Sequence, residues 1–220
     1  MGTTDRRERH RASLRREILD AASRLFVEEG YQRLTMRRLA ERIEYSPTTI
    51  YLYFKDKTEL LAAVCDETFA QLATKLERLK VSAPTPLGLL RDGLRTYVEF
   101  GLAHPNQYIV TYMNPTSGQV QPEVETSAGG RAFDTLRQGV RACAESGDIH
   151  TANVEATAQV LWAAVHGITS LFITEKSFPF AARQALVDHL IDTLLAGLKA
   201  PATSARPTVQ PQSKKWNYFE

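Results

Sequence analysis

Signals for the start of an α-helix recur along this sequence, and each is followed by apolar residues at helical spacing. Ser46 precedes Pro47 and Thr85 precedes Pro86, a pairing in which the hydroxyl caps the helix and proline takes the first helical position. The apolar residues that follow recur at the spacing of one helix face, and no stretch alternates polar and apolar residues as a half-buried strand does. The sequence therefore predicts an all-α fold.

The N-terminal part is predicted to form four helices. Thr35 stands where an N-cap is expected, Ser46 caps the next helix, and Asp56 with Glu59 has the pattern of a capping box. The apolar stripe of the first helix stops at Gly30, a residue typical of helix ends. The expected helices cover residues 14–29, 36–43, 47–53 and 57–80.

The C-terminal part continues with five more apolar stripes at helical spacing. They cover residues 87–98, 105–112, 133–143, 157–173 and 187–198. Residues 114–123, NPTSGQVQPE, are rich in turn formers and are expected to form a loop. Residues 201–220 are expected to be a flexible tail, although the WNYF near its end could dock on the protein.

Positive charge is concentrated at the start of the chain. The net charge is only +2, but residues 1–60 hold thirteen Lys and Arg against ten Asp and Glu. Residues 1–13 are expected to be a basic flexible arm, whose arginines either meet a polyanion or are simply solvated. No apolar run follows them, so we expect neither a signal peptide nor a membrane anchor, and we expect the protein in the cytoplasm.

The second and third predicted helices are short and close together, and the third opens with Ser-Pro-Thr-Thr. This arrangement is typical of a helix-turn-helix, whose second helix enters the major groove of DNA. Ile50 and Phe54 lie one turn apart and are expected to face the core, which leaves the hydroxyls and cations of this segment for phosphates and base edges. The side chains expected to meet DNA are those of Thr48, Thr49, Tyr51 and Lys57.

The segment from residue 14 to about 61, with ILDAASRLFVEEGYQRLTMRRLAERIEYSPTTIYLYFKDKTELL, resembles the DNA-binding domain of TetR-family transcriptional regulators. The likeness rests on the phenylalanine before Gly-Tyr, the threonine that opens the second helix, and the TIYLYFKDKTELL block. It implies an all-helical homodimer, usually a repressor released from its operator by a small effector. The implied domains are a helix-turn-helix over residues 14–58 and an effector-binding and dimerisation domain over residues 59–200.

The same resemblance implies a set of DNA contacts. Many members carry a glycine or another small residue where Thr48 stands, so the base preference stays open. The implied contacts with double-stranded DNA are Thr35, Arg37, Ser46, Pro47, Thr48, Thr49, Tyr51 and Lys57.

In the C-terminal part, Trp162, His166 and Gly167 form a W-x3-H-G motif that resembles a subgroup of these regulators. The motif names no ligand. The aromatic residues of this part either pack in the core or line an effector pocket, and His166 is either a core histidine or a ligand contact. The candidate pocket residues are Tyr97, Tyr108, Tyr112, Phe133, Trp162 and His166.

Two other interpretations compete with this one. The apolar segment around residues 161–173 approaches the length of a membrane span, but Gln159, Trp162 and His166 interrupt it, and a buried helix at a dimer interface explains it better. The helix-turn-helix could also be the scaffold of a helical small-molecule-binding protein or enzyme. The sequence has no glycine-rich phosphate loop, no HExxH and no GxSxG, and Cys65 and Cys143 stand alone. We therefore expect no enzyme activity, no metal and no cofactor.

Overall fold

The computed structural model describes residues 3–79, 85–112 and 128–199. Within these residues every regular element is an α-helix, so the all-α prediction is confirmed. The predicted loop at residues 114–123 and the predicted tail at residues 201–220 lie outside the described residues. The helices are α1 (Thr3–Glu29), α2 (Met36–Arg42), α3 (Pro47–Tyr51), α4 (Lys57–Leu79), α5 (Pro86–Ala103), α6 (Pro105–Tyr112), α7 (Ala128–Glu145), α8 (Val154–Thr174) and α9 (Arg183–Leu198).

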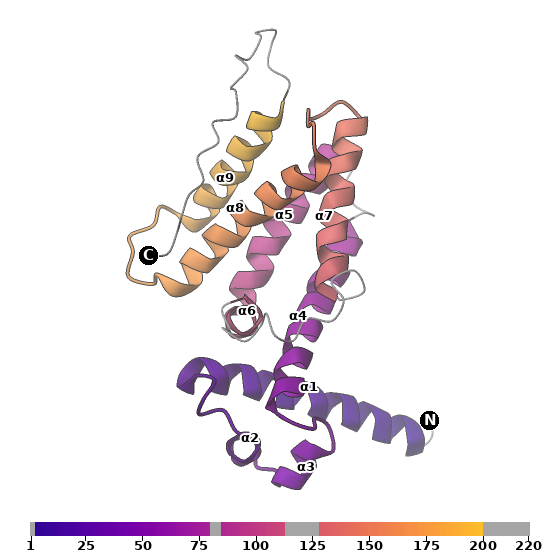
Figure 1. Cartoon of the computed structure of the whole chain (residues 1–220), viewed down its shortest axis with the longest axis vertical. Coiled ribbons are helices and arrows are strands. Elements are labelled where there is room, and N and C mark those ends of the chain that lie inside the picture. The colour runs from indigo at the N-terminus through magenta and orange to yellow at the C-terminus, as the bar shows by residue number, and fades with distance from the viewer. Residues whose placement is uncertain (1–2, 80–84, 113–127, 200–220) are drawn as a thin grey trace, which may run out of the picture.

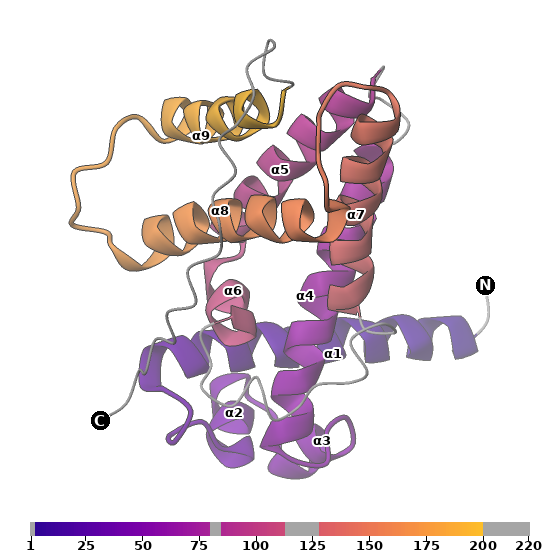
Figure 2. The same ribbon diagram turned by 45° about the horizontal axis from the view of Figure 1, so that its top comes forward.

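A long helix connects two hydrophobic cores. α1, α2 and α3 lie at one end, and α4 runs from them to the group formed by α5, α7, α8 and α9 (Figure 1). Figure 2 shows the same order after rotation, with α6 lying between α1 and the larger group. Within α4, Leu60 and Val64 are buried in the N-terminal core, whereas Leu72 and Leu76 are buried in the C-terminal core. The change from one core to the other therefore falls inside a continuous helix.

The predicted caps of the first helices are present. The side chain of Thr35 accepts from the Arg38 N–H at 3.2 Å, and that of Ser46 accepts from the Thr49 N–H at 3.2 Å. Between α2 and α3 the chain turns through Glu44, whose φ of 59° lies in the left-handed region that favours glycine. This tight turn sets α3 across α2, as a helix-turn-helix requires.

The prediction of a flexible arm over residues 1–13 is wrong for residues 3–13, because α1 begins at Thr3. Arginine, alanine and glutamate are good helix formers, and they extend a helix whose later turns are already held by the core. The described side chains of residues 6–13 are all exposed, and burial begins at Leu14. At the other end of this region, α3 stops at Tyr51, two residues before the predicted end, and Leu52 and Tyr53 form a turn.

α6 belongs to both cores. Val110 is fully buried among residues of the N-terminal core, while Tyr108 is 2% exposed in the C-terminal core. The helix packs on both α1 and α4, and Gln107 Nε2 donates to Asp20 Oδ1 of α1 at 3.0 Å. α6 therefore provides a second link between the helix-turn-helix and the larger helical part, beside the continuous helix α4 and made by side-chain contacts.

α8 is the one helix among the described residues that is long and apolar enough to cross a membrane. It packs instead against α5, α7 and α9. Leu161 and Val165 are each 1% exposed on its inner side. One side of α8 thus belongs to the C-terminal core, and the apolar residues of that side follow from this position.

Candidate functional site

Helix α3 presents polar side chains outward because its apolar ones are anchored. Ile50 is fully buried and Phe54 is 3% exposed, as predicted, whereas Tyr51 is 55% and Leu52 is 72% exposed. Ser46, Pro47 and Thr48 are exposed and Thr49 is half-buried. The rotation of this short helix is therefore fixed by two core contacts, and its opposite face is open to a partner.

The hydroxyls at the start of α3 are not equivalent. Ser46 caps the helix, and its Oγ also lies 2.9 Å from the Thr49 Oγ1. Both hydroxyls are thereby engaged within the chain. Thr48 is exposed between them, and it can offer a hydroxyl and a methyl group to a base edge.

The arginines of α2 divide into two roles. Arg38 pairs with Glu29 of α1 at 2.6 Å, and Arg42 pairs with Glu28, so these two hold α2 against α1. Arg37 has an 82% exposed side chain and contacts only Glu41 on its own helix in the described ion pairs, at 3.1 Å. An exposed pair of this kind contributes little to stability, so a phosphate can replace Glu41 as the partner of Arg37 at small cost.

Lys57 is held by a contact that the sequence did not predict. Its Nζ donates to the Tyr31 carbonyl at 2.8 Å and lies 3.7 Å from the centroid of the Tyr31 ring. The ammonium therefore ties the start of the α1–α2 connection to the start of α4. Lys55, two residues earlier, has an exposed side chain, and it is a cation beside α3 that the expected DNA contacts did not name.

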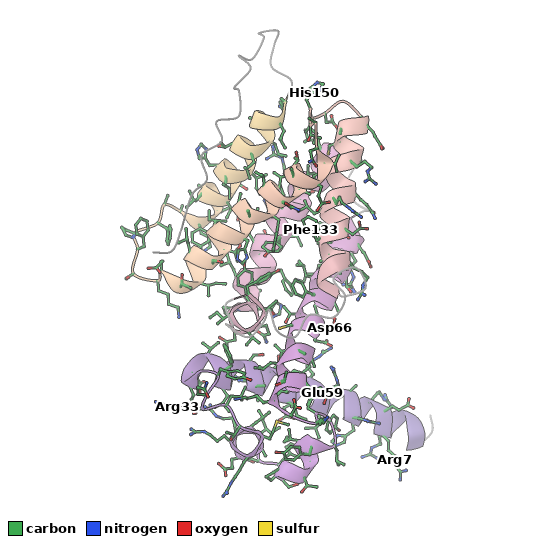
Figure 3. All side chains as sticks on the ribbon, viewed as in Figure 1. Arg7, Arg33, Glu59, Asp66, Phe133 and His150 are labelled. Carbon is green, nitrogen blue, oxygen red and sulfur yellow. The ribbon has the colours of Figure 1, made fainter. Side chains whose placement is uncertain are left out.

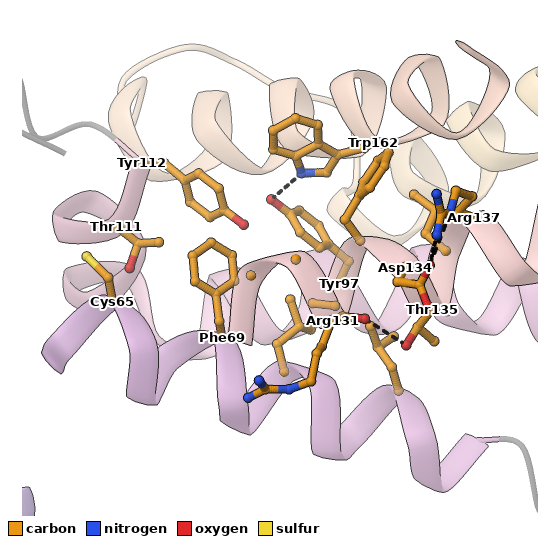
Figure 4. A pocket seen from close by; sticks show the side chains of 18 of the residues that line it. Cys65, Phe69, Tyr97, Thr111, Tyr112, Arg131, Asp134, Thr135, Arg137 and Trp162 are labelled. Atoms are coloured by element: carbon orange, nitrogen blue, oxygen red, sulfur yellow. Dashed lines mark hydrogen bonds and ion pairs between the residues drawn. The ribbon is translucent and has the colours of Figure 1, made fainter. Parts of the chain in front are cut away.

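A cavity of about 1930 Å³ lies beside α4 and is also lined by residues of α5, α6, α7 and α8. Four of the six candidate residues line it, from four different helices: Tyr97, Tyr112, Phe133 and Trp162. Figure 4 shows Tyr97, Tyr112 and Trp162 gathered around one end, opposite Phe69 of α4. Tyr108 and His166 do not line the cavity. They form a layer behind its wall.

A chain of hydrogen bonds connects this layer to the wall of the cavity. The Trp162 indole N–H donates to the Tyr97 hydroxyl at 3.3 Å, which lies 3.3 Å from the Tyr108 hydroxyl. The Tyr108 hydroxyl is 2.6 Å from His166 Nδ1, and Ser170 Oγ is 3.4 Å from the other ring nitrogen. The wall of the cavity is thus oriented by groups that a ligand does not touch.

Burial keeps these groups uncharged. It raises the pKa of Tyr97, Tyr108 and Tyr112 far above the ordinary value, and it lowers the pKa of His166. At neutral pH the aromatic end therefore offers neutral donors and acceptors. Thr111 adds a hydroxyl that lines the cavity, is 7% exposed and has no hydrogen-bond partner among the described residues.

Sequence reasoning missed the apolar side of the cavity. Phe69, Leu72 and Leu76 of α4 line it together with Leu90 and Leu94 of α5. Their helical spacing identified them as core residues, which they also are. Periodicity gives the inward face of a helix, but it does not tell whether that face meets another helix or a cavity.

One outer face of the larger part is apolar. Val160 is 60% and Leu171 is 47% exposed on α8. Between them, a side chain added at Gly167 would meet nothing within 4 Å. A glycine inside a helix costs about 1 kcal/mol relative to alanine, and no contact with another described residue accounts for it at this position.

The helix-turn-helix and the cavity together define a class of protein, a helix-turn-helix DNA-binding regulator with a second, helical part that can hold a ligand. Residues 18–64 match the family described as "Bacterial regulatory proteins, tetR family", and residues 90–194 match "Tetracyclin repressor-like, C-terminal domain". The chain belongs to the TetR family. This is a family of transcriptional regulators and not of enzymes, so the enzyme alternative is excluded.

Several characterised proteins are similar to this chain. A transcriptional repressor of Mycobacterium tuberculosis is 37% identical over 93 residues, which cover 42% of this chain and 47% of that protein. The repressor AcnR of Corynebacterium diphtheriae is 42% identical over 94 residues, 43% of each chain. These matches thus span less than half of each protein. The repressor BepR of Brucella suis is 27% identical over 201 residues, 87% of this chain and 94% of BepR.

Solved structures share the fold. A protein from Rhodococcus sp. RHA1 has a TM-score of 0.70 and 27% identity, covering 85% of this chain and 96% of that one. A TetR-family regulator from Marinobacter aquaeolei VT8 has a TM-score of 0.72 over 87% of this chain and 98% of that one, at 19% identity. The latter likeness concerns the fold alone.

Proposed function

We propose that this protein is a homodimeric repressor in the cytoplasm, whose α3 helices read a DNA operator and whose effector binds in the cavity beside α4. The observation that carries the proposal is the face of α3 that bears Thr48 and Tyr51. It is turned outward by Ile50 and Phe54, so its direction is built into the core. In a two-fold dimer, two such helices enter major grooves about 34–36 Å apart.

Selection from a library of random duplexes tests the reading function. The protein should enrich two half-sites related by two-fold symmetry, with centres about one helical turn, or a multiple of it, apart. Thr48→Ala should relax the preference at one base pair of each half-site, because Thr48 is the exposed hydroxyl and methyl group at the start of α3. No enrichment of any sequence by the wild-type protein would contradict the proposal.

The proposed dimer uses the apolar face of α8 together with α9. Val160 and Leu171 leave apolar surface uncovered, and the open position at Gly167 lets the backbone of a second helix approach closely. Leu171→Glu should therefore give a monomer in light scattering at micromolar concentration. Leu52→Glu is the matched control, because Leu52 is even more exposed but lies at the end of α3; it should leave the dimer intact.

The proposed effector is an uncharged, largely apolar molecule with at least one oxygen acceptor. Leucines and aromatic rings supply most of the cavity wall, and the neutral donors at its aromatic end are the hydroxyls of Tyr112 and Thr111. Three arginines also line the cavity, and each is already engaged within the protein. Arg15 lies 3.6 Å from Glu67, Arg131 interacts within the protein, and Arg137 is paired with Asp134 and lies 3.8 Å from Glu155. A carboxylate at the aromatic end would meet neutral hydroxyls, which do not offset the cost of burying its charge. An uncharged acceptor oxygen would find suitable donors there.

A matched pair of probes tests this chemistry. A long-chain primary alcohol should raise the thermal midpoint of the protein more than the carboxylate of equal chain length, and Tyr112→Phe, which removes one of the proposed donors, should reduce the difference. Stabilisation by the carboxylate alone would contradict the proposed effector class and leave the DNA-reading function untouched.

The proposed coupling between the two sites runs through α6. Tyr112 at the end of α6 faces the cavity, while Val110 and Gln107 on the same short helix contact the N-terminal core and α1. A ligand that moves Tyr112 therefore also moves α1, and with it the helix-turn-helix. The W-x3-H-G motif fits this arrangement, because Trp162 lines the cavity and His166 holds Tyr108 of α6; the subgroup it resembles is part of the same proposal.

A further inference from the structure

The first turns of α1 form a positively charged rod that the helix-turn-helix does not need. Residues 6–13 contain four arginines against one glutamate, and all of their side chains are exposed. From Thr3 to Leu14 the helix extends about 16 Å at 1.5 Å per residue. Among the described residues, the buried side chains of the N-terminal core begin only at Leu14, after this extension.

One face of the rod is turned toward the reading helix. Arg11 lies 5.9 Å over the ring of Tyr53, just after α3, and Arg15 lies 5.5 Å over the ring of Phe54. Arg7 precedes Arg11 by four residues and so lies on the same face, one turn farther out. Figure 3 shows Arg7 at the projecting end of α1, on the side where α3 lies.

The rod also points away from the proposed dimer helices. In both views the N-terminus lies on the opposite side of the molecule from α9 (Figures 1 and 2). In a dimer built on α8 and α9, the two rods therefore extend outward, past the outer edges of the two half-sites. A length of about 16 Å corresponds to roughly five base pairs at 3.4 Å each.

We propose that residues 6–11 of α1 bind the phosphates of the DNA that flanks each half-site, on its outer side, without reading its sequence. This inference rests on the proposed DNA-reading function and extends its footprint. Arginines on an exposed helix suit the phosphate backbone of a duplex, because each contact releases condensed counterions whatever the sequence. The flank is thus recognised by charge and position only.

The experiment compares two duplexes that contain the operator obtained by selection. One ends at the outer edges of the half-sites, and the other carries about six further base pairs on each side. For the wild-type protein, the longer duplex should bind more tightly and with a steeper dependence on salt. Arg6→Gln/Arg7→Gln should remove this advantage, lowering the slope by about two units and the affinity by about 30-fold at 0.15 M salt if both arginines contact phosphate.

The matched control removes the same charge elsewhere. Arg141→Gln/Lys176→Gln alters two exposed cations of the C-terminal part and should keep the wild-type slope on both duplexes. Circular dichroism should show that the Arg6→Gln/Arg7→Gln variant stays folded.

If this variant and the wild type bind the longer duplex with equal affinity and equal salt dependence, the inference is wrong, while operator binding itself survives. If the variant loses the same affinity on both duplexes, the rod does not act on the flanking DNA and the inference is also wrong.

Discussion

Lys55 and Lys57 are two residues apart, yet the structure predicts different consequences when each is removed. Lys57 makes a hydrogen bond to the Tyr31 carbonyl and stacks on the Tyr31 ring, whereas Lys55 has an exposed side chain. A charge-assisted hydrogen bond contributes about 1.5–3 kcal/mol and a cation–π contact about 0.5–1 kcal/mol. Because Lys57 is only half-buried, we reduce the sum to about 1–2 kcal/mol.

Lys57→Ala should therefore lower the thermal midpoint by about 2–8 °C, since 1 kcal/mol corresponds to about 2–4 °C in a chain of this size. Lys55→Ala should leave the midpoint within about 1 °C, as surface substitutions usually do. In salt titrations of operator binding, Lys55→Ala should lower the slope of log affinity against log salt concentration by about one unit. Calorimetric melting and fluorescence anisotropy measure the two effects. Equal midpoints for both variants would refute the argument that Lys57 ties the α1–α2 connection to α4.

Three further predictions concern single positions. Gly101→Ala should destabilise the protein by about 1–3 kcal/mol in urea unfolding, because its Cβ would lie 2.5 Å from Thr169 Cγ2 and 2.9 Å from the Tyr108 ring; Gly197→Ala, with open space around it, should not. Glu44→Gly should raise stability by up to about 1 kcal/mol, because the φ of 59° suits glycine; an unchanged melting midpoint would count against strain at this turn. Burial lowers the pKa of His166, so the unfolded chain binds this proton more readily and stability should fall as pH drops below about 6.5. His166→Gln should flatten that decline in melts between pH 5 and 7.5, leaving the part due to His104, whose pKa is also lowered by burial.

Local sequence signals predicted the helix starts and the inward face of α3. Thr35 and Ser46 cap the helices that they were predicted to cap, because an N-cap is decided by its own residue and the three that follow. The inward side of α3 was also predictable, since Ile50 and Phe54 are the apolar residues one turn apart. The prediction of a flexible arm was wrong for residues 3–13 for the converse reason. Residues 3–13 lack an apolar stripe, and the pattern does not reveal that an adjoining helix can extend through them.

The cavity was only half predictable. Tyr97 and Trp162 line it, but Tyr108 and His166 lie one layer behind, and aromatic identity alone does not separate a wall from its support. The anchoring of Lys57 was beyond local reasoning, because its partner, Tyr31, is 26 residues away in the sequence. Long-range contacts of this kind depend on how α1 and α4 cross.

The central claim is that the outward face of α3 reads DNA sequence. Fluorescence anisotropy at 0.15 M salt should measure the affinity of the wild-type protein and of Tyr51→Ala for the selected operator and for a scrambled duplex of equal length. We expect the wild type to bind the operator at least about 10³-fold more tightly than the scrambled duplex, and we expect Tyr51→Ala to lose much of its operator affinity while it remains folded. Equal affinity of the wild type for the two duplexes would contradict the account.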